Sequence, residues 1–196
     1  MSAVLPSFEE DTFPDHQVAQ LRIPPHSLEA ESSVLGGLLL DNSAWDRVGD
    51  LVTDSDFYRY EHRLVFSAVA ALINSSRPAD VITVFEHLQS LGKADEVGGL
   101  AYLNSLAQYV PSASNIRRYG EIVRERAILR KLVTASDEIA TTAFSPKGRP
   151  VAQILDEAEQ KIFHIGEEGS RMKQGFQSMN SLVVDLLDRV EEMSQN

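Results

Sequence analysis

The sequence contains no cysteine among its 196 residues. Disulfide bonds and thiolate metal sites are therefore excluded, which favours a protein of the reducing cytoplasm. No apolar run approaches the roughly 20 residues that a membrane-spanning helix needs, and the N-terminus has no hydrophobic signal-peptide core. The sequence thus predicts a soluble, cytoplasmic protein with no membrane partner.

Positive charge is also scarce. Lysine and arginine total 18 against 29 aspartates and glutamates, so the formal net charge is −11. Autonomous nucleic-acid binding depends on many cationic contacts with phosphates. The charge balance therefore argues against a chain that binds DNA by itself.

Catalytic motifs are missing as well. There is no G-x-x-x-x-G-K-[ST], no G-x-G-x-x-G and no G-x-S-x-G. The five histidines are scattered over different predicted elements, and we interpret each as a surface or capping residue. Asp54 and Asp56 have no third ligand nearby and are interpreted as solvated turn residues. We predict no catalytic residue, no cofactor site and no metal site, so this chain alone is not expected to be an enzyme.

Apolar residues recur at the three- and four-residue spacing of helices, and nowhere with sustained two-residue alternation. Ser27 and Asp80 are expected N-caps, and Gly92 is an expected helix stop. We predict an all-α fold in which a disordered tail (residues 1–22) precedes a compact head (residues 23–111). The helices expected in the head cover residues 28–40, 43–52, 60–73, 81–91 and 98–110.

Residues 112–165 predict a long antiparallel helical hairpin. Helical spacing continues to residue 144, the stretch FSPKGRP then ends the helix, and a shorter return helix follows Pro150. From Ile128 onward two adjacent stripes of the long helix are apolar, and one return arm cannot cover both. The uncovered stripe predicts a partner, which is either the rest of the chain or a second copy of it.

Residues 166–180 contain three glycines among polar residues and predict a flexible linker. Residues 181–196 predict a terminal amphipathic helix that docks on another surface. The chain ends soon after this helix, as expected of a piece of a longer protein. The apolar residues expected to dock are Leu182, Val183, Leu186, Leu187 and Val190.

One basic cluster departs from the acidic background. One interpretation is local pairing within the long helix, such as Arg117 with Glu121. The other is a basic strip that binds an acidic partner, and in so acidic a chain a protein is favoured over DNA. The cluster consists of Arg117, Arg118, Arg124, Arg126, Arg130 and Lys131.

Five segments, in order, resemble the N-terminal region of the bacterial replicative DNA helicase, the DnaB family. They are IPPHSLEAESSVLGGLLLDNSAWD (residues 23–46), DFYRYEHRLVF (56–66), PADVITV (78–84), VGGLAYLNSL (97–106) and PSASNIRRYGEIVRERAILRKL (111–132). The match is nearly continuous from residue 23 to about residue 165. The RecA-like ATPase domain of the family is missing beyond Asn196, so ATP hydrolysis and DNA unwinding would belong to a longer parent protein.

The resemblance implies that hairpins pair between subunits and that three dimers form the collar of a hexamer. It also implies that the C-terminal helicase-binding domain of primase binds the hairpin, with a helicase loader or initiator as a further partner. The terminal helix resembles the linker helix that packs on a neighbouring ATPase domain, and only that missing domain would bind ATP, Mg²⁺ and DNA. The residues expected to contact partners are Ile128, Arg130, Leu132, Val133, Ile139, Ile154 and Ala158.

Two other functions stay open from the sequence. A stand-alone DNA-binding domain could hide a helix-turn-helix between residues 28 and 91, although no short helix there is rich in Arg, Asn and Gln. An enzyme with an unrecognised pair of acids would need a polar pocket. We favour a non-catalytic module that assembles a replicative helicase and recruits primase at the replication fork.

Overall fold

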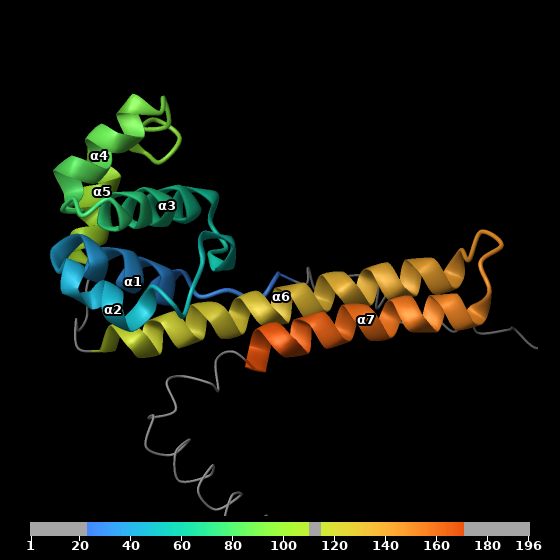
Figure 1. Ribbon diagram of the computed structural model, residues 1–196. Helices are drawn as coiled ribbons and strands as arrows, with labels where there is room; N and C mark the ends of the chain where they lie inside the picture. The colour runs from blue at the N-terminus through green and yellow to red at the C-terminus, as the bar shows by residue number, and fades with distance from the viewer. Residues whose placement is uncertain (1–22, 110–114, 171–196) are drawn as a thin grey trace, which may run out of the picture.

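The computed structural model describes residues 23–109 and 115–170 of the chain. These residues form seven α-helices, two short 3-10 helices and no β-strand (Figure 1). The predicted all-α class is therefore confirmed. The expected tail, most of the expected linker and the expected terminal helix with its docking residues lie outside the described residues.

Helix α1 (Leu28–Leu40) is the central helix of the head. The backbone N–H of Ala30 donates to the Ser27 hydroxyl oxygen at 3.3 Å, which confirms the predicted N-cap. Nine of its 13 residues are buried, so it packs on most of its sides. A Cβ at Gly37 would lie 2.8 Å from Cδ1 of Ile116. This glycine therefore permits the close approach of α1 and the start of the long helix α6.

Four further helices complete the head. The Asp80 carboxylate accepts hydrogen bonds from the backbone N–H groups of Ile82 (2.9 Å) and Thr83 (2.8 Å), which confirms the predicted cap of α4. Gly92 follows α4 with a φ of +70°, the left-handed conformation of a helix stop. The elements are η1 (Asn42–Ala44), α2 (Trp45–Val48), η2 (Asp54–Asp56), α3 (Tyr60–Asn74), α4 (Val81–Ser90) and α5 (Gly99–Gln108).

The antiparallel hairpin consists of α6 (Ile116–Phe144) and α7 (Val151–Ser170). The first part of α6 packs against α1, α2 and η2, whereas its second part extends away from the head beside α7 (Figure 1). The turn between the arms uses positive φ angles at Lys147 (+47°) and Gly148 (+78°). A hairpin joined at a turn of this kind is what the sequence predicts.

Helix α7 is longer than the sequence predicts. A linker is expected from residue 166, but Gly166 and Gly169 lie within the last turns of α7, which ends at Ser170. The extension is held by Glu168, because its carboxylate pairs with Lys131 and its carbonyl oxygen accepts a hydrogen bond from Arg124 at 3.2 Å. These tertiary contacts outweigh the weak helix propensity of glycine.

Candidate interaction surface

Exposed apolar side chains line one side of the hairpin. On α7, Val151, Leu155 and Ile162 are 73%, 58% and 44% exposed. They lie within about 40° of one another around the helix axis, because consecutive residues of an α-helix are about 100° apart. On α6, Leu132, which is 41% exposed, and the half-buried Ile139 lie about 20° apart around the helix axis, and neither lines the groove between the arms. We call these five residues the apolar face.

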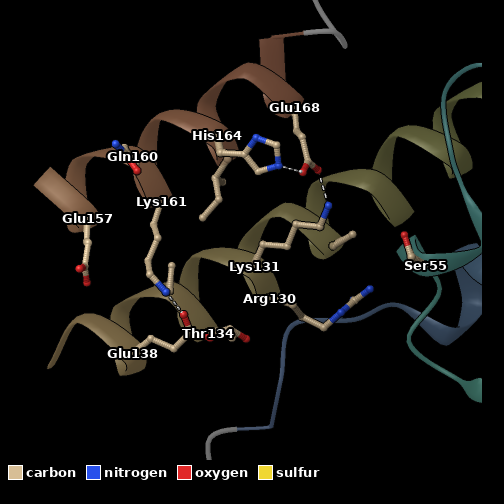
Figure 2. A pocket seen from close by; sticks show the side chains of 13 residues that line it. Ser55, Arg130, Lys131, Thr134, Glu138, Glu157, Gln160, Lys161, His164 and Glu168 are labelled. Carbon is tan, nitrogen blue, oxygen red and sulfur yellow. Dashed lines mark hydrogen bonds and ion pairs between the residues drawn. The ribbon is translucent and has the colours of Figure 1, made fainter. Parts of the chain in front are cut away.

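The opposite side of the hairpin is polar. A groove of about 840 Å³ lies between the arms there, and charged side chains of α6 and α7 point into it (Figure 2). Lys161 pairs with Glu138 across the groove, Lys131 pairs with Glu168, and His164 Nε2 lies 3.3 Å from Glu168 Oε1. The hydrogen bond from Lys131 holds the pKa of the Glu168 carboxyl below its usual range. Charges on this side therefore have partners within the chain.

The predicted contact residues fall into two groups. Leu132 and Val133 are 41% and 48% exposed and are accessible to a partner. Ile139 and Ile128 of α6 are only half-buried. On α7 the prediction names Ile154 and Ala158, which are likewise half-buried. Their role in binding stays a prediction.

Sequence reasoning did not include several exposed apolar residues of the hairpin among the expected contacts. Phe163 and Phe144 are 67% and 89% exposed, and Leu155 and Ile162 belong to the apolar face. The sequence does contain a signal for Leu155 and Ile162. Helix α7 carries a second apolar stripe, one position beside the stripe that includes Ile154, in the same way that α6 carries two.

The basic cluster is largely engaged within the chain. Arg117 and Arg118 pair with Glu121 at 3.5 and 3.1 Å, as the local interpretation predicts. Arg130 donates to the carbonyl oxygens of Pro25 (2.7 Å) and Asp56, and so ties α6 to the chain before α1 and to η2. Burial lowers the pKa of the Arg130 guanidinium.

Asp56 is not the solvated turn residue that the sequence suggests. Its side chain is 0% exposed and lies 2.7 Å from Nη1 of Arg124. The two residues are 68 positions apart, so no local pattern reveals the pair.

His62 is likewise not a surface residue, because it is only 1% exposed. Its Nδ1 lies 2.6 Å from Glu31 Oε2 and its Nε2 lies 2.7 Å from the Tyr102 hydroxyl. Glu31 also accepts hydrogen bonds from the backbone N–H groups of Tyr58 (2.7 Å) and Arg59 (3.4 Å). This polar cluster joins α1, α3 and α5 inside the head, and its bonds account for its burial.

The family of the chain follows from the match of its head and the start of its hairpin to a known domain. The family model described as "DnaB-like helicase N terminal domain" matches residues 23–125. The chain belongs to this family. The resemblance seen in the sequence is therefore confirmed.

Relatives of the DnaB family support the assignment over a longer stretch. The chain is 42% identical over 181 residues to the replicative DNA helicase DnaB of Haemophilus influenzae. It is 33% identical over 172 residues to the replicative DNA helicase DnaC of Bacillus subtilis. These alignments cover 92% and 88% of this chain but only 39% and 37% of the relatives. The chain thus spans well under half of their length.

Solved DnaB structures share the fold. The N-terminal domain of DnaB helicase from Mycobacterium tuberculosis is 38% identical, with a TM-score of 0.70 over 72% of this chain and 99% of that domain. A DnaB-like replicative helicase described with its interactions with primase has a TM-score of 0.58 at 18% identity, covering 78% of this chain and 36% of that one. The second likeness concerns the fold alone.

Two findings bear on other site types. Within residues 23–109 and 115–170, no group of three or more His, Asp or Glu side chains is arranged to hold a metal ion. Over the same ranges, no helix combines the length and apolarity needed to cross a membrane.

Proposed function

We propose that this chain is the non-catalytic N-terminal assembly module of a longer, cytoplasmic replicative DNA helicase. Its hairpin pairs with the hairpin of a second copy, and three such dimers form the collar of a hexamer. Its exposed hairpin surface also recruits the C-terminal domain of primase, and a loader or initiator is a further partner. The remainder of the helicase binds ATP, Mg²⁺ and DNA. The terminal helix of this chain docks on that remainder through Leu182, Val183, Leu186, Leu187 and Val190.

The observation that carries this proposal is the uncovered apolar face of the hairpin. Four of its five side chains are 41–73% exposed in the described chain, namely Val151, Leu155, Ile162 and Leu132. Burying one Leu or Ile side chain contributes about 1.5–3 kcal/mol. A face of this kind is stabilised by a partner, and a second copy offers the same face.

Charge supports a protein partner over DNA. The net charge is −11, and Arg124 and Arg130 of α6 are engaged in hydrogen bonds within the chain. Few cations of α6 are left for phosphates, and no observation favours the stand-alone DNA-binding alternative.

The proposal of self-association is tested by light scattering over a wide concentration range. Leu155→Glu places a charge on the apolar face and is expected to weaken dimerisation by about tenfold or more. Gln160→Glu is the matched control, because it adds the same charge to the same helix on the groove side and should leave dimerisation unchanged. Equal dimerisation of both variants, or a wild-type chain that stays monomeric at all concentrations, would reject pairing through this face.

Primase recruitment needs its own experiment. A primase C-terminal domain is titrated into the chain, and Val133→Glu is compared with Thr134→Glu on the groove side. Val133→Glu is expected to lower the affinity by about tenfold, because it places a charge in an apolar contact. Undiminished binding by Val133→Glu would reject this placement of primase while leaving the dimer intact.

A further inference from the structure

A single guanidinium joins three elements at the base of the hairpin. Arg124 of α6 is 9% exposed. Its Nη1 donates to Oδ1 of Asp56 in η2 at 2.7 Å, and its Nη2 donates to Glu168 of α7, at 3.2 Å to the carbonyl oxygen and 3.5 Å to Oε2. The head loop and the last turn of α7 therefore meet at one side chain.

On the head side, Asp56 organises the loop that Arg124 contacts. Its Oδ2 accepts hydrogen bonds from the Thr53 backbone N–H (2.8 Å) and hydroxyl (3.1 Å), while its own carbonyl oxygen accepts from Arg130. One buried carboxylate thus holds both the loop backbone and Arg124. A displacement of Arg124 changes the hydrogen bonding of the loop directly.

On the hairpin side, the end of α7 is suited to release. Gly166 and Gly169 lie in its last turns, and glycine is a weak helix former. The carboxylate that holds this end, Glu168, remains 21% exposed and is shared between Lys131, His164 and Arg124. The chain continues from this turn to Asn196.

We propose that Arg124 couples the end of α7 to the head. In the engaged state Arg124 holds both Asp56 and Glu168. In the released state the last turn of α7 opens, Arg124 loses its acceptors there, and the loop of residues 53–57 loosens. A partner that binds or displaces the chain beyond Ser170 therefore changes the head loop through this one side chain.

The coupling is intramolecular and reciprocal. The coupling free energy is the same whichever end is perturbed. Destabilising the loop of residues 53–57 must therefore also destabilise the end of α7. In an assembled helicase, the chain beyond Ser170 would influence the head of the same subunit. This consequence rests on the proposed function. The coupling itself needs only one chain, so it stands or falls independently of dimerisation.

The first test is hydrogen–deuterium exchange of the full chain, read by mass spectrometry. Glu168→Gln removes the charge that holds the end of α7 and is expected to speed exchange there by about two- to fivefold. The distinguishing result is a parallel rise at the Asp56 and Phe57 amides, which bond to Thr53 and Asp54. Glu167→Gln, an exposed neighbour, is the control and should change neither region. If Glu168→Gln speeds exchange only in α7, or in neither region, the proposal is overturned.

The second test asks whether Arg124 carries the coupling. Arg124→Lys keeps the charge but lacks the planar fork that reaches two acceptors. In this background Glu168→Gln should no longer affect the loop amides, and a retained effect would overturn the role of Arg124. Asp56→Asn should speed exchange at residues 165–170 in turn, with α1 amides as the measure of global folding. If Asp56→Asn unfolds α1, the test rests on Glu168→Gln, alone and in the Arg124→Lys background.

Discussion

The head and the hairpin use the same kind of secondary structure but differ in how their apolar surface is covered. In the head, side chains such as Leu35, Phe57 and Leu103 are completely buried. In the hairpin, no residue between 136 and 169 is buried, and each of them is half-buried or exposed. The two regions therefore differ in how much apolar surface the described chain covers.

The reason is geometric. Helix α1 packs against α3, α5 and α6, so it can be apolar on most of its sides. Two helices side by side cover only one stripe of each, and the second stripe of α6 and of α7 stays in water. The head is thus stabilised from within, whereas the outer hairpin keeps apolar side chains exposed.

The largest expected effect comes from one substitution made in both regions. Phe57→Ala empties a site that is 0% exposed and should lower the free energy of unfolding by about 3–5 kcal/mol. Phe163→Ala removes the same side chain where it is 67% exposed and should change the value by less than about 0.5 kcal/mol. Urea unfolding at concentrations that keep the chain monomeric measures both. Similar losses would contradict the contrast between the regions.

A second prediction sharpens the account of the head, whose core is not only apolar. Glu31→Ala leaves the backbone N–H groups of Tyr58 and Arg59 and the ring of His62 without their acceptor. Each unpaired buried group costs about 1–3 kcal/mol, so a total loss of about 3 kcal/mol is expected by urea unfolding.

The control for this prediction lies on the same helix. Glu29→Ala removes a carboxylate that is exposed and should cost less than about 1 kcal/mol. Equal costs for Glu29→Ala and Glu31→Ala would mean that the buried cluster contributes nothing beyond helix capping.

The features that sequence predicts here are those with local causes. Ser27 and Asp80 cap helices because the N–H groups that they accept from lie within three residues. The hairpin turn follows from the prolines and glycine between the arms. The two-stripe pattern of α6 likewise predicts an exposed surface around Leu132 and Val133.

What sequence could not predict depends on distant contacts. Asp56 looks like a turn residue until Arg124 is brought to it, and Glu31 looks like a first-turn acid until His62 of α3 is brought to it. The prediction for the end of α7 is wrong for the same reason, since its glycines favour a linker whereas distant residues such as Lys131 and Arg124 contact Glu168 there. Long-range ion pairs leave no periodic trace in a single sequence.

A third prediction concerns a local feature of the head. Asp80→Ala removes the cap of α4 and should cost about 1 kcal/mol in the free energy of unfolding. Asp80→Asn retains an acceptor oxygen and should recover most of that loss. Failure of Asp80→Asn to recover stability would indicate that charge, rather than the hydrogen bonds to Ile82 and Thr83, is what stabilises α4.

The smallest expected effect is the pH dependence of the contact between the hairpin arms at Glu168. Its pKa is lowered, chiefly by the hydrogen bond from Lys131, so the stabilisation is present above the unfolded pKa of about 4.3 and is lost as pH falls through the lower folded value. The carboxylate keeps some contact with water, so the effect should stay below about 1 kcal/mol. The difference in melting temperature between the wild type and Glu168→Gln should therefore be largest near neutral pH and shrink toward zero in acid. Glu167→Gln should show no such trend, and a difference for Glu168→Gln that persists in acid would mean that the side chain stabilises α7 through packing and not through its charge.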